Sequence, residues 1–204
     1  MQRPSNIILA SGNQKKLREL SQILNKFSVE LVAQTQFDIP EAVEDGLTFV
    51  ENAIKKARHA CHHLQQPAIA DDSGIEVDYL KGAPGIYSAR YAGKSASDQQ
   101  NLEKLIEAMQ GIPDDQRTAR YQCVIVYMQH EFDPTPLICQ ASWRGQLLEV
   151  PRGEGGFGYD PLFFCPQLNK TAAEMTPEEK ASVSHRGKAL ALFQSLFTEI
   201  YSQG

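Results

Sequence analysis

The stretch Pro67–Gly74 reads P-A-I-A-D-D-S-G and joins a short apolar run to two adjacent carboxylates, Asp71 and Asp72. A short apolar run bounded by turn residues is typical of a buried strand. Acids at its end would lie at the edge of a sheet, where open α/β folds bind their ligands. Asp, Ser and Gly also form ordinary turns. Taken alone, the stretch predicts a strand that ends in a turn. It predicts a metal–phosphate site only if other segments contribute to it.

The length and charge of the chain limit the function classes. Its 204 residues are enough for one domain with a substantial core, and 42% hydrophobic and 22% charged residues are ordinary for a soluble globular protein. The net charge of −5, without a long Lys/Arg run, argues against nucleic-acid binding. A few local basic groups still suffice for a small anionic substrate. No stretch is long enough for a membrane span.

The four cysteines are widely spaced and form no C-x-x-C pair (Cys61, Cys123, Cys139 and Cys165). Their apolar neighbours favour buried free thiols over a zinc site or a disulfide framework. Free thiols indicate a reducing compartment, and the N-terminal apolar run is too short for a secretory signal. We therefore expect a cytoplasmic protein.

Hydrophobic periodicity predicts alternating strands and helices. Capping boxes open helices at Thr48–Glu51, Ser97–Gln100 and Thr176–Glu179. Further helices are expected after the turn at residues 11–13 and after Ser184. Strands are expected over residues 7–10, 29–33, up to Asp71, 75–80, 119–128 and 137–145, the last two as an antiparallel hairpin that residues 147–150 extend. The pattern predicts one α/β domain over residues 1–204 with a mixed sheet, and a pinned irregular loop over 81–93.

Two segments could contribute to a phosphate and metal site. Ser11-Gly12-Asn13-Gln14-Lys15-Lys16 joins a strand to a helix, where N–H groups and the helix dipole attract anions. It lacks the Walker A pattern, and a turn with a solvated lysine explains it equally well. Glu44 could be a third carboxylate beside Asp71 and Asp72 around one hard cation. Lys56 could reach phosphate oxygens or lie exposed on its helix.

Residues 153–158 satisfy G-x-G-x-x-G, but the dinucleotide interpretation is rejected. That motif needs a strand, a glycine turn and a helix, whereas Tyr159-Asp160-Pro161 and a β-like run follow here. The glycines instead suggest a close-approach loop in which Phe157 stacks on a planar ligand. A glycine-rich hairpin with Phe157 in the core is the alternative.

A basic cluster lies near a helix start in this acidic chain. It comprises Lys180, His185, Arg186 and Lys188. These side chains could donate to acceptor oxygens of a ligand, or they could simply be solvated at a helix end. A second group, His59, His62 and His63, is assigned to a helix surface because no partner gives metal-ligand spacing.

Six segments, in this order, resemble the inosine triphosphate pyrophosphatase family. They are S-G-N-Q-K-K (11–16), E-D-G-L-T-F-V-E-N-A (44–53), A-D-D-S-G (70–74), G-A-P-G-I-Y-S-A-R-Y-A-G (82–93), G-G-F-G-Y-D-P (155–161) and S-H-R-G-K-A (184–189). Each motif alone is weak, but together they span almost the whole chain. The resemblance implies an elongated mixed β-sheet flanked by helices, with two lobes and a central nucleotide cleft.

The resemblance also implies an activity, a cofactor and residue roles. The activity is Mg²⁺-dependent hydrolysis of ITP, dITP and XTP to the monophosphate and pyrophosphate by a homodimer. Glu44 and Asp72 would hold Mg²⁺, with Asp72 as the catalytic base. The substrate would be bound by Ser11, Gly12, Asn13, Gln14, Lys15, Lys16, Lys56 and Ser73 and, at the base, by Phe157, Gly158, Tyr159, Asp160, Lys180, His185 and Arg186. Asp71 would support the site from the strand end.

Three other functions remain as alternatives. The nearest is a related nucleotide pyrophosphatase for another base, such as a modified pyrimidine. A non-catalytic nucleotide sensor is disfavoured because three acids near a triphosphate repel it unless a metal intervenes. A nucleic-acid-binding module is disfavoured by the acidic charge balance.

Overall fold

A computed structural model describes residues 3–201 of the chain and contains a seven-stranded sheet. The strand order is β2-β1-β3-β4-β5-β6-β7. The strands are β1 (Asn6–Leu9), β2 (Glu30–Ala33), β3 (Ala68–Val77), β4 (Thr118–Met128), β5 (Leu137–Leu147), β6 (Phe163–Cys165) and β7 (Lys170–Thr171).

Five α-helices accompany the sheet: α1 (Gln14–Leu24), α2 (Phe49–Leu64), α3 (Asp98–Ala108), α4 (Pro177–Val183) and α5 (His185–Tyr201). Short 3₁₀ turns are η1 (Asn25–Phe27), η2 (Gln34–Gln36), η3 (Gly85–Arg90) and η4 (Asp114–Gln116). The expected capping boxes are present at Ser97 and Thr176. At α2 the Thr48 hydroxyl accepts from the Glu51 amide, while the Glu51 carboxylate reaches back to the amide of Leu47.

Strand pairing makes the sheet mixed, as the sequence predicts. β1 pairs in parallel with both β2 and β3, and β6 pairs antiparallel with β5 and β7. β4 and β5 are neighbours joined by residues 129–136, a connection too short for a parallel crossover, so they form the expected hairpin.

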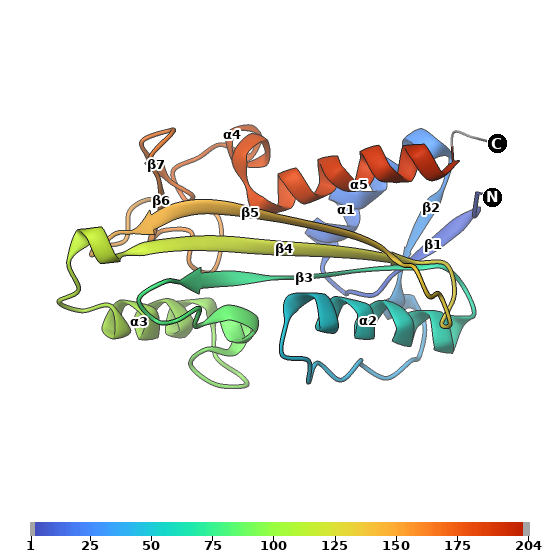
Figure 1. Ribbon diagram of the computed structural model, residues 1–204, viewed down its shortest axis with the longest axis horizontal. Coiled ribbons are helices and arrows are strands. Elements are labelled where there is room, and N and C mark those ends of the chain that lie inside the picture. Colours follow the sequence, from blue (N-terminus) through green and yellow to red (C-terminus); the bar gives the residue numbers. More distant parts are fainter. Residues whose placement is uncertain (1–2, 202–204) are drawn as a thin grey trace. The chain divides into compact units, whose positions relative to one another are not determined.

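The chain divides into two compact units. The first comprises the chain up to Asp72, Val124–Gln140 and the chain from Ala189 onward, and the second comprises Ser73–Cys123 and Ala141–Lys188. In the first unit, α2 covers one face of the strands, and α1 and α5 cover the other (Figure 1). Because both faces are covered, the apolar residues Ile7, Ile8 and Leu9 of β1 are fully buried.

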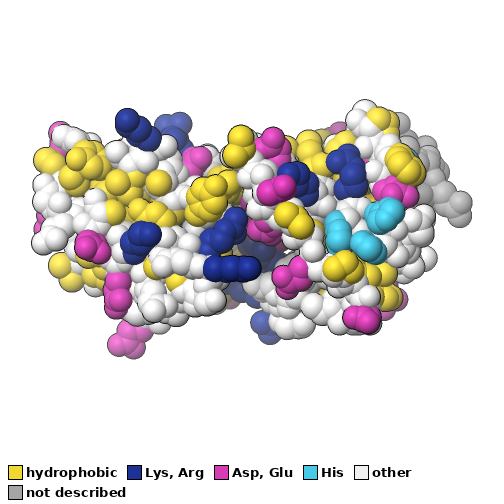
Figure 2. All heavy atoms as spheres, turned by 90° about the horizontal axis from the view of Figure 1, so that it is seen from below, with side chains coloured by type: hydrophobic (Ala, Val, Ile, Leu, Met, Phe, Trp, Pro, Cys, Tyr) yellow, Lys and Arg dark blue, Asp and Glu magenta, His cyan; other side chains and the backbone are white. Residues whose placement is uncertain are grey.

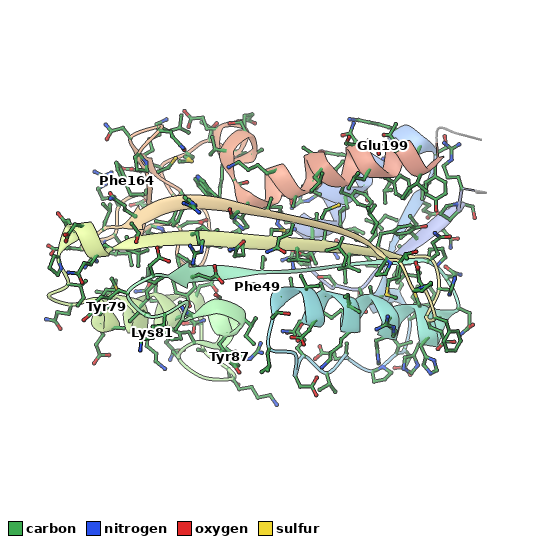
Figure 3. The ribbon with its side chains drawn as sticks, in the orientation of Figure 1. Phe49, Tyr79, Lys81, Tyr87, Phe164 and Glu199 are labelled. Carbon is green, nitrogen blue, oxygen red and sulfur yellow. The ribbon has the colours of Figure 1, made fainter. Side chains whose placement is uncertain are left out.

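The second unit has its own aromatic and aliphatic core. Trp143, Phe163 and Leu105 are among its most buried side chains. In this unit α3 lies on one side of the strands and α4 on the other (Figure 1). The region 81–93, expected to be irregular, contains η3, which is pinned because Asn101 of α3 bonds to the backbone of Ala89 and Ala92. Between β3 and η3, Tyr79 and Lys81 lie on the connecting turn (Figure 3).

Two expected strand boundaries were wrong. The strand predicted over 75–80 ends at Val77, and β5 ends at Leu147 rather than continuing through residue 150. Beyond β5, the Leu148 amide bonds to the Leu162 carbonyl. All four cysteines are buried free thiols, which confirms that expectation. Among residues 3–201, no helix is sufficiently long and apolar to cross a membrane.

Candidate active site

Asp71 and Asp72 lie in the middle of β3, which corrects the prediction that a strand ends there in a turn. β3 continues through Ser73 and Gly74 to Val77. Its parallel neighbour β1 stops at Leu9, which pairs with Ile69, so the first strand ends just before the two acids. The two acids therefore lie beside the carboxyl end of β1, because β3 extends beyond this shorter strand. Open α/β sheets bind ligands at the carboxyl ends of their strands.

Successive strand residues point to opposite faces, and this separates the two acids. Asp71 Oδ1 is 2.8 Å from Lys16 Nζ of α1, and its side chain is fully buried. Asp72 Oδ1 accepts a hydrogen bond from Lys56 Nζ of α2 at 2.9 Å. Since α1 and α2 cover opposite faces of the first unit (Figure 1), each acid has its own lysine partner.

The Ser11–Lys16 segment forms a strand-to-helix entry in which Asn13 caps the helix. Asn13 is the N-cap of α1, and its Oδ1 accepts from the amides of Lys15 (2.9 Å) and Lys16 (3.2 Å). The Asn13 amide donates to Ser11 Oγ. The Asn13 cap thus engages two of the helix N–H groups that the prediction assigns to an anion, and phosphate binding by this segment stays a prediction. Gly12, Gln14 and Lys15 are exposed beside them.

Lys56 is held by two carboxylates rather than lying exposed on its helix. Its Nζ lies 3.1 Å from Glu44 Oε1 and 2.9 Å from Asp72 Oδ1, and only 13% of its side chain is exposed. Glu44 comes from the loop before α2, whose first turn is anchored by the buried ring of Phe49 (Figure 3). The predicted grouping of Glu44, Lys56 and Asp72 is therefore present.

Negative charge exceeds positive charge in this cluster, and the pKa values reflect it. Burial raises the pKa of Asp72, and the neighbouring charges of Glu44 and Asp71 add to that rise although Lys56 opposes it. Burial alone would lower the pKa of Lys56, but attraction to Asp72, Asp71 and Glu44 outweighs it, so the pKa is raised. Both directions indicate a site that favours additional positive charge.

Glu44 and Asp72, the two carboxylates beside Lys56, are suitable ligands for a magnesium ion whose other ligands are water and phosphate oxygens. Within residues 3–201, no group of three or more His, Cys, Asp or Glu side chains is arranged to hold a metal. Glu44 and Asp72 nevertheless converge on one ammonium nitrogen. Mg²⁺ is commonly bound through one or two carboxylates together with water and substrate phosphates. The number and type of these two carboxylates fit such a site.

In the second unit, Asp160 holds together the glycine-rich loop and Lys180. Only 2% of Asp160 is exposed. Its Oδ2 accepts from the Phe157 amide at 2.9 Å and from Lys180 Nζ. Gly156 permits the close approach of the Asp160 carboxylate to the loop. Its φ is +76°, and a Cβ at this position would lie 2.2 Å from Asp160 Oδ2.

The loop presents Phe157 to solvent, so the alternative that places this ring in the core is wrong. Phe157 is 58% exposed, and Lys180 Nζ lies 4.9 Å from the centre of its ring. Tyr159 is instead 5% exposed, and its hydroxyl donates to the Ser88 carbonyl. Of the predicted base-pocket residues in the loop, Phe157 offers an exposed ring, Asp160 accepts from the Phe157 amide, and Tyr159 is buried.

His185 begins α5 and stacks on residues that the sequence did not single out. Its ring centre lies 4.7 Å from that of Tyr121 with 12° between the planes, and 6.3 Å from that of Trp143. The Tyr121 hydroxyl donates to Asp160 Oδ1 at 3.2 Å. Only the alternation of inward residues along β4 points to Tyr121, and that pattern predicts a core residue rather than a site residue.

The remaining predicted residues have simple positions. Ser73 is half-buried in β3 directly after Asp72, and Arg186 is half-buried in the first turn of α5. His59, His62 and His63 lie on α2, as expected, and histidine side chains gather over that helix (Figure 2). His62 Nδ1 is 2.5 Å from Glu131 Oε2, and the ring centres of His59 and His63 are 4.4 Å apart.

Comparison with known proteins identifies the family. The model of the Ham1 family matches residues 7–196. The chain belongs to the Ham1 family. A dITP/XTP pyrophosphatase of Vibrio parahaemolyticus is 57% identical over 197 residues, covering 97% of each chain. A dITP/XTP pyrophosphatase of Escherichia coli is 59% identical over 186 residues, covering 91% of this chain and 94% of that protein.

Solved structures of Ham1 proteins confirm the predicted fold class. A HAM1 protein from Coxiella burnetii matches with a TM-score of 0.92 and 46% identity, over 96% of this chain and 100% of that one. The Staphylococcus aureus Ham1 protein matches with a TM-score of 0.88 and 37% identity, over 95% and 98%. The mixed sheet with flanking helices is therefore the Ham1 fold, and the resemblance seen in the sequence is confirmed.

Proposed function

We propose that this Ham1 protein hydrolyses deaminated purine nucleoside triphosphates, namely ITP, dITP and XTP, to the nucleoside monophosphate and pyrophosphate. The observation that carries the proposal is the 57–59% identity, over nearly the whole chain, to proteins named dITP/XTP pyrophosphatase. The two side-chain clusters support it, since one suits phosphates with a metal and the other suits a purine base.

The first cluster supplies the groups that the reaction needs at the phosphates. Water attacks the α-phosphorus, a P–O bond forms, and the bond to the β-phosphate oxygen breaks so that pyrophosphate leaves with the electron pair. Asp72 accepts the proton of the attacking water. Lys16 and Lys56 neutralise phosphate oxygens.

Magnesium is proposed as the cofactor, held by Glu44 and Asp72. When bound, the ion neutralises charge that develops on the pyrophosphate leaving group. The charge balance supports this assignment, because the two carboxylates of Glu44 and Asp72 share the single ammonium of Lys56.

The second cluster explains how a deaminated base could be selected. Hypoxanthine and xanthine carry a 6-oxo acceptor, whereas adenine carries a 6-amino donor at that position. Donors from Lys180, His185 and Arg186 would pair with the oxo group, and adenine would leave donors facing each other. Such mismatched polar contacts can discriminate by on the order of 10⁴-fold. The exposed ring of Phe157 is suited to stack on the purine.

We further propose that the protein acts as a cytoplasmic homodimer that removes deaminated purines from the nucleotide pool. The four buried free cysteines support a reducing compartment. The dimer is proposed from the family resemblance.

The test incubates purified protein with ITP, dITP, XTP, GTP and ATP, in Mg²⁺ and in EDTA, and resolves the products by ion-exchange chromatography. We expect pyrophosphate and inosine monophosphate from ITP in Mg²⁺, with GTP and ATP nearly untouched and EDTA abolishing turnover. Orthophosphate with a nucleoside diphosphate would contradict the proposal. Tight ITP binding without any product would favour the nucleotide sensor.

A further inference from the structure

We propose that Tyr121 is a positioning residue for base recognition, because it carries the His185 imidazole on its ring and fixes the Asp160 carboxylate with its hydroxyl. The inference deepens the proposed function and rests on it. The side chain comes from β4, a strand that contributes no predicted site residue.

The ring of Tyr121 is a fixed support for His185. Only 8% of Tyr121 is exposed. The imidazole lies on it with ring centres 4.7 Å apart and 12° between the planes. Phe163 packs against the same tyrosine at 4.7 Å, and Trp143 stacks at 6.1 Å. With these aromatic neighbours the tyrosine ring has little freedom to tilt, so the plane of the imidazole is set by it.

The hydroxyl of Tyr121 determines where the Asp160 carboxylate lies. It donates to Asp160 Oδ1, while Oδ2 of the same carboxylate accepts from Lys180 and from the Phe157 amide. One buried carboxylate thus joins Tyr121 to a base-pocket lysine and to the backbone of the exposed aromatic. Burial, followed by the charge of Asp160, raises the pKa of Tyr121 far above its usual range, so the phenol remains a donor.

This arrangement assigns Tyr121 to selection of the base rather than to bond cleavage. Its ring and hydroxyl contact His185 and Asp160, residues of the base cluster in the same unit. Without the hydroxyl, Asp160 Oδ1 loses its donor, and the carboxylate can turn towards Lys180. The lysine and the Phe157 loop then lose their fixed positions, whereas the stacking on His185 remains.

Tyr121→Phe removes the hydroxyl alone, and Tyr121→Leu removes the ring as well. Tyr127→Phe is the matched control, because Tyr127 lies on the same strand, is 2% exposed and has its hydroxyl 2.8 Å from that of Tyr201. Binding of inosine and adenosine monophosphates is followed by the fluorescence of Trp143, the single tryptophan of the chain. ITP and ATP hydrolysis is measured alongside.

For Tyr121→Phe we expect about tenfold weaker binding of inosine monophosphate and about tenfold higher KM for ITP, with kcat within about twofold, because one hydrogen bond to a buried carboxylate is lost. The preference for inosine over adenosine nucleotides should fall, because the donors that reject the 6-amino group lose their fixed positions. Tyr121→Leu should show a larger loss of the same kind, and Tyr127→Phe should bind as the unaltered protein does.

Two results would overturn the inference. One is unchanged affinity and base preference in Tyr121→Phe. The other is an equal loss in Tyr127→Phe, which would reveal a general packing effect. The binding measurement also distinguishes a failure of this inference from a failure of the proposed function. If the unaltered protein failed to hydrolyse ITP yet Tyr121→Phe weakened inosine monophosphate binding, the function would fail and the positioning role would stand.

Discussion

At the scale of single residues, the neighbouring acids Asp71 and Asp72 take different environments because a strand turns consecutive side chains to opposite faces. Asp71 is fully buried against Lys16, whereas Asp72 keeps 15% of its side chain exposed and shares Lys56 with Glu44. Asp72 thus combines a raised pKa with access for a ligand, whereas the side chain of Asp71 has no exposed surface. This supports its assignment to the base and metal role, with Asp71 as the partner that holds Lys16.

We therefore predict that Asp72→Asn lowers turnover of ITP by about 10³-fold, because the proton acceptor is lost. Nucleotide binding, followed by Trp143 fluorescence, should persist. Asp71→Asn should retain turnover within about tenfold, because it removes one charged contact to Lys16 rather than the base. Steady-state kinetics with ITP and Mg²⁺ distinguishes the two variants.

Asp45→Asn is the control for that pair of variants. Asp45 lies next to Glu44, but its side chain is 68% exposed and it pairs with the exposed Lys55. Removing its charge should leave kinetics unchanged. A loss of turnover in Asp71→Asn together with retained turnover in Asp72→Asn would reverse the assigned roles.

The sequence predicts a site residue well when its role depends on its neighbours in the chain, and poorly when its role depends on residues far away in the sequence. The motifs name the charged residues, since Lys, Asp and Glu at those spacings have few uses in a core. They do not show that D-D-S-G lies within a strand, because the turn preference of Asp, Ser and Gly is local, whereas β3 is held by its neighbours in the sheet. Nor do they reveal Tyr121, whose role comes from contacts with residues 39 and 64 positions away, Asp160 and His185.

At the scale of elements, the helices were predicted best because their signals are local. Ser97 and Thr176 make the capping boxes that their spacing predicts. The glycine-rich loop was predicted to be a close-approach segment, and its glycines do allow close approach, but towards Asp160 of the protein itself. The burial of Tyr159 was not predictable from the motif, because its hydroxyl partner Ser88 belongs to the distant η3.

A substitution in the glycine-rich loop, residues 153–158, tests the contact between this loop and Asp160. Gly156→Ala places a Cβ 2.2 Å from Asp160 Oδ2 at a φ of +76°. The carboxylate must move, so both stability and base binding should suffer. We expect a loss of about 3 kcal/mol of unfolding free energy in urea, from left-handed strain and the broken contacts of Asp160, and a higher KM for ITP.

Gly158→Ala is the matched control for the loop. Its φ is +59°, but a Cβ there meets nothing within 4 Å. Strain alone should cost about 1 kcal/mol. Equal losses in the two variants would show that contact with Asp160 is unimportant.

At the scale of the whole molecule, the two compact units divide the proposed work. The acids and lysines assigned to the metal and phosphates, Lys16, Glu44, Lys56 and Asp72, belong to the first unit. The residues assigned to the purine base belong to the second unit, and they include Phe157, Lys180 and His185. The family resemblance implies two lobes, but the sequence pattern does not show which residues belong to which, because each unit is assembled from separate segments of the chain.

The buried cysteine thiols and tyrosine hydroxyls in the two units predict a loss of stability at alkaline pH. Burial raises the pKa of Cys61 and of Cys139 to about 11, and it is the first cause of the raised pKa values of Tyr121, Tyr127 and Tyr159. In the unfolded chain these groups release their protons near their usual values, whereas the folded protein retains them. Between pH 9 and 11 the folded state thus binds more protons, and the unfolding free energy falls as pH rises.

Each such group lowers the unfolding free energy by up to about 1.4 kcal/mol per pH unit once the pH exceeds its usual pKa, so the two thiols and three phenols together give an expected loss of about 6 kcal/mol between pH 8 and pH 10.5. Urea unfolding at the two pH values measures it. Absorbance at 295 nm should show that the buried tyrosines ionise only upon unfolding. Cys139→Ala removes one contributor and should flatten the pH dependence, because alanine has no proton to release. A stability that stays constant up to pH 10.5 would contradict the retention of these protons by the folded core.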